Sequence, residues 1–373
     1  MKTATLIGYH GYQNFGDDIF FKVTCEWLQQ KKDIKRCFVT ATKDSVLPDI
    51  NGIEIVPFIK PYRISRLRWI SILIKAYQSN IIIFSAGSIF TIQPFIIMYL
   101  VLRILKLIKR HDFNIYALGV SIGPFKNNID QYWCKKSLEL MDYVQLRDSQ
   151  SIELLKRLNY KGHFLESYDL ALALKVPTKP QINHGQIKMA LAITSRGFGY
   201  CDETNHSSVC DSIFHAVDKA MRKHPRMELN ILSVCSDELD GDTQLTKHIR
   251  QRFNEDLLDR IKCTYYDSKQ NDEMMKIISE CNLMISSRMH AGILATMSGV
   301  PTYQISYAEK ITNFFLHTGI SLEYLKKPSE VESESLFSYI EKASNGMLNE
   351  FSIHQQQLLM QKGRLVQNDL SEL

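Results

Sequence analysis

An arginine and a histidine stand two positions apart where a buried strand is expected to run into a helix. The apolar residues 283–285 predict a buried parallel strand, and the small apolar residues 291–297 predict a helix packed tightly on a sheet. Arg288 and His290 then lie at the carboxyl end of a strand, where open α/β sheets bind ligands. Helix amino termini and guanidinium groups both favour anions. The pair predicts an anion site, although a local ion pair for Arg288 and a capping or core position for His290 would explain the same residues.

A second arginine stands in an equivalent place in the same half of the chain. Residues 187–194 predict a strand, and Arg196 follows it directly. Two arginines from two strand ends of one sheet can converge on a doubly anionic ligand. Arg196 and Arg288 are therefore expected to act together, although either one alone would more often be a salt-bridge partner.

The loop after the first expected strand is rich in glycine. Gly8, Gly11 and Gly16 separate that strand from a helix that begins near residue 19, but their spacing does not match the GxGxxG pattern of dinucleotide sites. The glycines allow the backbone to approach a ligand or a neighbouring segment closely. Asp17 and Asp18 come at the helix start, where one carboxylate favours the helix dipole and the other could be catalytic.

Strands and helices alternate through most of the chain. A length of 373 residues predicts about two domains. Strand and helix signals repeat over 1–175, stop in the polar, proline-containing stretch 175–186, and restart over 187–328. We expect two α/β domains with doubly wound parallel sheets, facing each other. The charged, helical residues 329–373 are expected to pack across the domains or cap one end.

The amino-acid composition indicates which class of protein this is and in which compartment it works. The chain is 45% hydrophobic and 23% charged, as is ordinary for a soluble globular protein. Its net charge of +5 is not gathered into a basic stripe with interleaved aromatics, so no nucleic-acid partner is expected. Eight cysteines without a CxxC pair predict reduced thiols instead of a zinc site or a disulfide framework. Because Gly8 interrupts the first apolar run, we expect no signal peptide and a cytoplasmic protein.

Two segments of the first half combine apolar and basic residues. Residues 62–78 and 89–110 both predict amphipathic helices that carry arginines and lysines. The second run is interrupted by Gln93, Pro94 and Arg103, so it is not expected to span a membrane. Two interpretations stay open: a surface that makes peripheral contact with anionic lipid, or ordinary sheet-covering helices with solvated basic faces.

Several short motifs, taken in order, resemble those of a known family. The motifs are GYHGYQNFGDD from Gly8, SAGS from Ser85, GVSIGP from Gly119, RDSQS from Arg147, a lone Asp169, and SSRMHAGILATMSGVPTYQISYAEK from Ser286. Together they cover most of the chain and resemble the polysaccharide pyruvyl transferases, and the last motif is the most specific. The SAGS loop departs from the family pattern, which usually has three glycines before its serine.

The resemblance implies both an architecture and a reaction. It implies two Rossmann-like domains facing across a cleft in a GT-B-like arrangement. It also implies transfer of a pyruvyl group from phosphoenolpyruvate to a sugar as a ketal, with release of phosphate. The acceptor would be a cell-surface or exopolysaccharide building block, often lipid-linked. By motif position, Arg196, Arg288 and His290 would contact phosphoenolpyruvate. His290 is expected to be a general acid or a phosphate-binding cation, and Asp17 a candidate base.

No metal-binding motif is visible, so we predict metal-independent chemistry without a cofactor. Two other functions stay open. A GT-B glycosyltransferase using a nucleotide sugar would share the architecture and would need an acidic residue such as Glu309 to hold the ribose. A non-catalytic scaffold or sensor of polysaccharide assembly would have no reason to keep both arginines and His290. The sequence does not specify the acceptor sugar or the oligomeric state.

Overall fold

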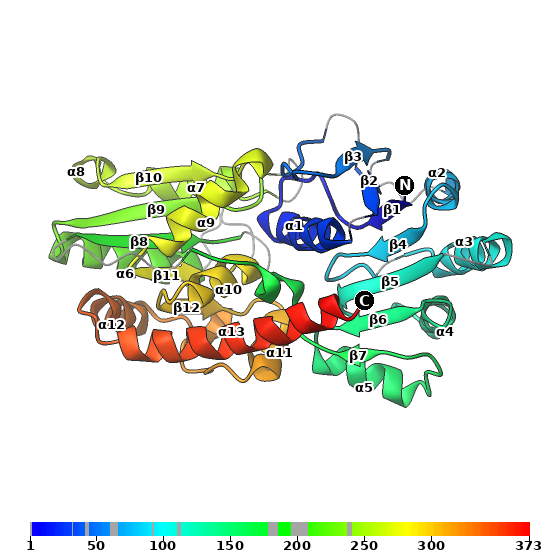
Figure 1. Cartoon of the computed structure of the whole chain (residues 1–373). Coiled ribbons are helices and arrows are strands. Elements are labelled where there is room, and N and C mark those ends of the chain that lie inside the picture. Colours follow the sequence, from blue (N-terminus) through cyan, green and yellow to red (C-terminus); the bar gives the residue numbers. More distant parts are fainter. Residues whose placement is uncertain are drawn as a thin grey trace. The chain divides into compact units, whose positions relative to one another are not determined.

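A computed structural model describes residues 2–31, 33–41, 45–59, 66–91, 93–109, 113–177, 186–194, 208–236 and 241–373. The chain divides into two compact units (Figure 1). The first unit comprises Met1–Tyr12, Asp17–Leu174 and Gly363–Leu373, and the second comprises Gln13–Gly16 and Lys175–Lys362. Each unit is an α/β layer structure around its own parallel sheet, which confirms the prediction of two Rossmann-like folds.

The first unit is built on a parallel sheet of seven strands in the order β3-β2-β1-β4-β5-β6-β7. Its strands are β1 (Lys2–Ile7), β2 (Ile34–Val39), β3 (Glu54–Pro57), β4 (Ile81–Phe84), β5 (Asn114–Val120), β6 (Tyr143–Leu146) and β7 (Leu165–Glu166). Apolar runs such as that of β4 are buried throughout, because helices cover both faces of a parallel sheet. The strand order reverses between β1 and β4, which makes their carboxyl ends a topological switch point.

Helices cover the first sheet. They are α1 (Phe15–Gln30), α2 (Arg66–Tyr77), α3 (Phe95–Ile108), α4 (Asn128–Leu138), α5 (Ser149–Arg157) and the 3₁₀ helix η1 (Leu170–Ala173). Among the described residues, no helix of the chain is long and apolar enough to cross a membrane. The core lies between the sheet and helices α2, α3 and α4, where Trp69, Met98 and Leu138 are almost fully buried.

The second unit is built on a parallel sheet of six strands in the order β10-β9-β8-β11-β12-β13. Its strands are β8 (Ile187–Ala192), β9 (Met227–Ser233), β10 (Ile261–Tyr265), β11 (Leu283–Ser286), β12 (Thr302–Ile305) and β13 (Leu325–Lys326). Its helices are α6 (Ser208–Lys223), α7 (Thr243–Gln251), α8 (Glu255–Leu258), α9 (Asn271–Ser279), α10 (Met289–Met297), α11 (Glu309–Thr318), α12 (Ser333–Ser344) and α13 (Asn349–Ser371), with 3₁₀ helices η2 (Ser268–Gln270) and η3 (Pro328–Glu330). Here the order reverses between β8 and β11, which pair in register.

Two segments group with the unit that is not their neighbour in sequence. The loop Gln13–Gly16 belongs to the second unit, where Phe15 N donates to Val234 O at 3.0 Å and Ser236 N donates to Gln13 O at 2.9 Å. The end of α13 belongs to the first unit, where Trp27 Nε1 donates to Leu370 O at 2.6 Å. The chain therefore passes between the units at several points, and a single linker does not describe its organisation.

The cysteines depart in one respect from the sequence prediction. Six of those described remain thiols, among them Cys25, Cys37 and Cys134, which are buried as expected. Cys210, at the start of α6, is disulfide-bonded. The expectation that every thiol is reduced is therefore wrong at this position, and the lack of a CxxC spacing could not reveal it, because disulfide partners need only be close in space.

Candidate functional site

The predicted turn from strand to helix forms at the switch point of the second sheet. Arg288 is the N-cap of α10, with extended backbone angles of φ −85° and ψ 115°. The corner is held by Ser286, whose Oγ accepts from Arg288 N at 3.1 Å and donates to Arg288 O at 2.8 Å. Ser287 Oγ accepts from Thr194 N at 2.8 Å and so ties β11 to the end of β8. The hydroxyls of these two serines thus bond backbone groups just beyond the strand ends, where the backbone hydrogen bonds of the sheet stop.

Arg288 is paired with a carboxylate that the sequence did not single out. Its Nε donates to Asp242 Oδ2 at 2.8 Å and to Oδ1 at 3.1 Å, and its Nη2 donates to Oδ1 as well. Asp242 is fully buried, and the side chain of Arg288 is 13% exposed. The local ion pair that the sequence left open for Arg288 is therefore present. Asp242 lies in a run of several acidic residues, and nothing in their spacing indicates which one reaches Arg288.

The surroundings of Asp242 fix the position of this pair. Asp242 N donates to Cys235 O at 2.7 Å, and the Thr194 hydroxyl donates to the carboxylate. Burial raises the pKa of the Asp242 carboxyl, and Arg288 and Thr194 oppose that rise. Burial also works against the charge of Arg288, but Asp242 outweighs it and raises the pKa of the guanidinium. Arg288 stays charged and is held in one orientation.

His290 lies against the glycine-rich loop of the amino-terminal part of the chain. A Cβ built on Gly16 would stand 2.1 Å from Nδ1 of His290, so only glycine allows the loop backbone to approach the imidazole this closely. The loop is held beside it by an antiparallel bridge between Asn14 and Cys235 and by Phe15, whose ring packs edge-on against Tyr266 at 5.2 Å. His290 is the second residue of α10 and is half-buried in the first turn of that helix.

The other two predicted site residues are placed differently. Asp17 lies in the first turn of α1 and belongs to the first unit. It is half-buried near Tyr9, whose pKa is raised by burial and further by the Asp17 charge. Arg196 lies outside the described residues, although the strand that precedes it, β8, pairs directly with the strand that precedes Arg288. The structure brings together Arg288 and His290, and it adds Asp242 and Gly16 to them.

The remaining motifs meet at the carboxyl edge of the first sheet. Arg147, which follows β6, donates from Nη1 to Asp169 Oδ2 at 2.6 Å and from Nε to Ser121 Oγ at 2.8 Å. A Cβ on Gly87 of the SAGS loop would stand 2.1 Å from Arg147 Nη1. Arg147 is 6% exposed and Asp169 is fully buried at the side chain. Residues of four motifs, SAGS, GVSIGP, RDSQS and Asp169, thus meet at one buried guanidinium.

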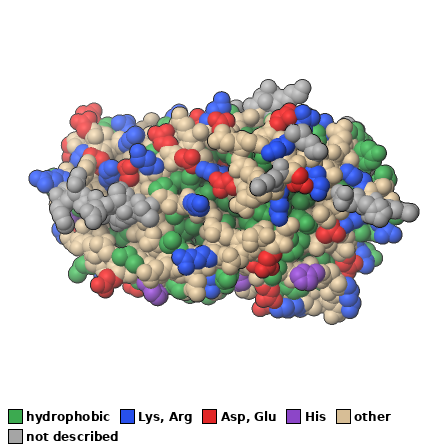
Figure 2. Space-filling model, in the orientation of Figure 1, with side chains coloured by type: hydrophobic (Ala, Val, Ile, Leu, Met, Phe, Trp, Pro, Cys, Tyr) green, Lys and Arg blue, Asp and Glu red, His purple; other side chains and the backbone are tan. Residues whose placement is uncertain are grey.

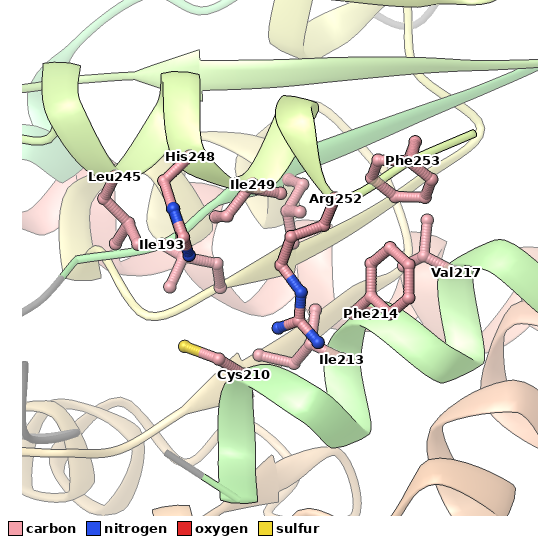
Figure 3. Close-up of a pocket in the computed structure, with 11 residues that line it drawn as sticks. Ile193, Cys210, Ile213, Phe214, Val217, Leu245, His248, Ile249, Arg252 and Phe253 are labelled. Carbon is pink, nitrogen blue, oxygen red and sulfur yellow. The ribbon is translucent and has the colours of Figure 1, made fainter. Parts of the chain in front are cut away.

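A pocket in the second unit has a mostly apolar lining, which does not suit an anionic ligand (Figure 3). It lies between β8, α6 and α7 with about 410 Å³ of empty space that includes open solvent, and Figure 3 shows Ile193, Ile213 and Leu245 around it. Arg252, one of the described lining residues, donates to Asp211 at 2.8 Å and lies over the Phe214 ring at 4.4 Å. Within the described part of the chain, no group of three His, Cys, Asp or Glu residues could hold a metal ion.

Comparisons with known proteins give a family and a fold. A family model described as polysaccharide pyruvyl transferase matches residues 14–309. A search of curated proteins finds no match. Among solved structures, the chain is similar to the UDP-GlcNAc 2-epimerase of Neisseria meningitidis bound to UDP-GlcNAc, at 11% identity, TM-score 0.59 and 100% coverage of both chains.

Other solved structures share this architecture. The chain is similar to HepE of Anabaena in complex with UDP-glucose, at 10% identity, TM-score 0.57 and 100% coverage of both chains. It is also similar to MnaA of S. aureus with UDP, at 13% identity and TM-score 0.57, over 95% of this chain and 91% of that one. These neighbours are GT-B enzymes, and at such low identity they show the fold alone.

Proposed function

Because the chain belongs to the polysaccharide pyruvyl transferase family and is thereby a transferase, we propose that it moves the pyruvyl group of phosphoenolpyruvate onto a sugar of a cell-surface or exopolysaccharide precursor. The product would be a ketal across two hydroxyls, with phosphate released. The observation that carries the proposal is the fixed guanidinium of Arg288 beside His290 at the amino terminus of α10, next to the switch point of the second sheet.

The charges around Arg288 limit how the donor can bind. Asp242 already balances the positive charge of Arg288, so this pair alone offers little net attraction to a multiply charged anion. The extra attraction would come from the amino terminus of α10, from His290 when protonated, and from Arg196. Asp242 is then a positioning residue: it fixes the plane of the Arg288 fork before the donor arrives, which lowers the entropy cost of binding.

The reaction needs one proton donor and one proton acceptor near the donor's reacting carbons. The first sugar hydroxyl oxygen bonds to C2 as the C3 methylene gains a proton. The second hydroxyl oxygen bonds to C2 as the bond from C2 to the phosphate oxygen breaks. One hydroxyl proton thus ends on the new methyl group and the other on the released phosphate. His290 is suited to deliver the first proton or to bind the phosphate, and Asp17 is the candidate base.

A combined binding and turnover assay tests this proposal. Calorimetry with phosphoenolpyruvate, and phosphate release with a panel of simple and lipid-linked glycosides, should both give a signal with the full chain. Failure of both would contradict the pyruvyl transfer reaction. We expect phosphate release to persist after chelation of divalent metals, and a strict metal requirement would show that the metal-independent mechanism is wrong.

A nucleotide-sugar donor is the second candidate, because similar solved structures hold UDP, UDP-GlcNAc or UDP-glucose. Glu309, the acidic residue considered for the ribose, is exposed at the first turn of α11, where a carboxylate also favours the helix dipole. Thermal unfolding with UDP in parallel with phosphoenolpyruvate separates the two donors. A larger stabilisation by UDP, lost in Glu309→Gln, would favour glycosyl transfer.

A further inference from the structure

Two neighbouring helices of the first unit, α2 and α3, each expose a second apolar stripe to solvent. Their inner stripes are buried against the sheet, as Trp69 and Ile72 of α2 and Met98 and Leu102 of α3 show. The outer side chains, which we call the apolar surface, are Ile70, Ile74 and Tyr77 of α2 and Ile96, Leu100, Ile104, Leu107 and Ile108 of α3. Each of these is between 41% and 58% exposed. The two helices also pack against each other.

The apolar surface is not needed for the fold of this unit. Its residues recur at helical spacing on the side opposite the core, and isolated exposed apolar residues would not show that period. In Figure 2, hydrophobic side chains reach the surface in the part of the view that holds α2 and α3. A contiguous apolar stripe of this size generally marks a contact with a partner or a membrane.

The charge of this segment indicates what the partner is. Residues 55–111 contain nine Lys and Arg residues and no Asp or Glu. The basic side chains do not form the solvated face that the sequence left open. Arg68 is 3% exposed, Lys75 lies over the Phe38 ring at 4.6 Å, and Lys109 donates to Tyr77 O at 2.9 Å. Arg103 is exposed among the outer leucines and isoleucines. Lys106 is ion-paired with Asp142 at 2.6 Å, so among the described side chains of the two helices Arg103 carries the exposed positive charge.

We propose that the apolar surface of α2 and α3 docks the protein on an anionic lipid bilayer. The outer Ile and Leu side chains would enter the boundary between headgroups and acyl chains, and Arg103 would meet the negative headgroups. A second copy of the chain is a poorer occupant, because it would bring the same acid-free, basic segment against itself. The proposal concerns where the protein works, and it does not depend on the identity of the donor.

Vesicle flotation of the full chain tests this proposal. Wild type should float with vesicles of phosphatidylcholine and phosphatidylglycerol, and less with phosphatidylcholine alone or at high salt. The double variant Ile104→Glu/Leu107→Glu places two anions in the stripe and should lower the vesicle-bound fraction by roughly tenfold or more. Ile104 and Leu107 are 41% and 57% exposed, so thermal unfolding should change little.

A matched control comes from the second unit. Leu316 of α11 is 60% exposed, close to the 57% of Leu107, and lies outside the acid-free segment. Leu316→Glu should leave flotation unchanged. The proposal is overturned if wild type floats with neither kind of vesicle, or if the double variant floats as wild type does. It is equally overturned if light scattering shows a dimer that the double variant dissociates while vesicle binding stays the same.

Discussion

The carboxyl edges of the two sheets carry nearly the same set of residues and differ in how far these are buried. In the first unit, Arg147 pairs with Asp169, and His10 lies against Gly8. In the second unit, Arg288 pairs with Asp242, and His290 lies against Gly16. Each edge thus combines an arginine, a buried carboxylate, and a glycine that leaves room for an imidazole ring.

Burial separates the two edges. The side chain of Arg147 is 6% exposed, and its guanidinium is enclosed by Asp169, Ser121 and Gly87. His10 is 1% exposed, and burial lowers its pKa to about 3, so it is neutral wherever enzymes usually work. Arg288 and His290 are half-buried at the start of a helix. Residue types at a strand end therefore do not by themselves make a site, and we expect the less buried second edge to be the one that binds a ligand.

The largest expected effect is that of breaking the Arg288 pair. Arg288→Ala leaves Asp242 buried without its partner and should cost about 3–5 kcal/mol of stability, together with donor binding. The double variant Arg288→Gln/Asp242→Asn keeps the hydrogen-bonding shape without charges and should recover most of that stability. Urea unfolding and calorimetry with phosphoenolpyruvate measure the two effects. Donor binding that survives in the folded double variant would exclude Arg288 from the donor site.

The equivalent change in the first unit should affect stability alone. Arg147→Ala leaves Asp169 uncompensated and should also cost about 3–5 kcal/mol of unfolding free energy. The charge-free double variant Arg147→Gln/Asp169→Asn should recover both stability and donor affinity, unlike its counterpart in the second unit. Urea unfolding and calorimetry with phosphoenolpyruvate measure stability and donor affinity here as well. If the well-folded double variant no longer binds phosphoenolpyruvate, the first edge also contributes to donor binding and its role is not structural alone.

Gly16 offers a way to displace His290 without removing it. In Gly16→Ala the new Cβ would overlap His290 Nδ1, so the imidazole must move, and phosphate release should fall by roughly 100-fold. In a His290→Ala background the overlap is gone, and the helical position should then accept alanine at no cost or gain up to about 1 kcal/mol. Steady-state assays and thermal unfolding of the four proteins form a double-mutant cycle. Additive losses of stability would mean that Gly16 and His290 do not touch.

We expect a smaller, pH-dependent effect of His10 on the free energy of unfolding. Its folded-state pKa of about 3 lies below the value of about 6.5 for an unfolded chain, so the unfolded state takes up a proton first. Stability is therefore lost as pH falls below about 6.5, by about 2 kcal/mol between pH 7 and pH 5. His10→Gln should remove this loss, as urea unfolding at the two pH values would measure. Identical pH profiles of the two proteins would show that His10 is not buried in the neutral form.

Much of the fold could be predicted from the chain alone. Short apolar runs such as residues 283–285 indicate strands of a parallel sheet, because helices cover both faces of such a sheet and bury its strands. The same signal placed Arg288 and His290 correctly at a strand end that enters a helix, because that arrangement is local. The motif order further indicated the family, which the family model confirms.

Contacts distant in sequence were decided only by the tertiary structure. Nothing local indicates that Asp242 pairs with Arg288 across 46 positions, or that Gly16 meets an imidazole from the other half of the chain. Burial is likewise a property of the packed molecule. Packing buried Arg147 and His10, and it drew Arg68 of α2 into the interior, although the sequence suggested a solvated basic face there. Sequence determined which residues could do chemistry, and packing decided which of them a ligand can reach, because both partners and solvent access are set by segments far apart along the chain.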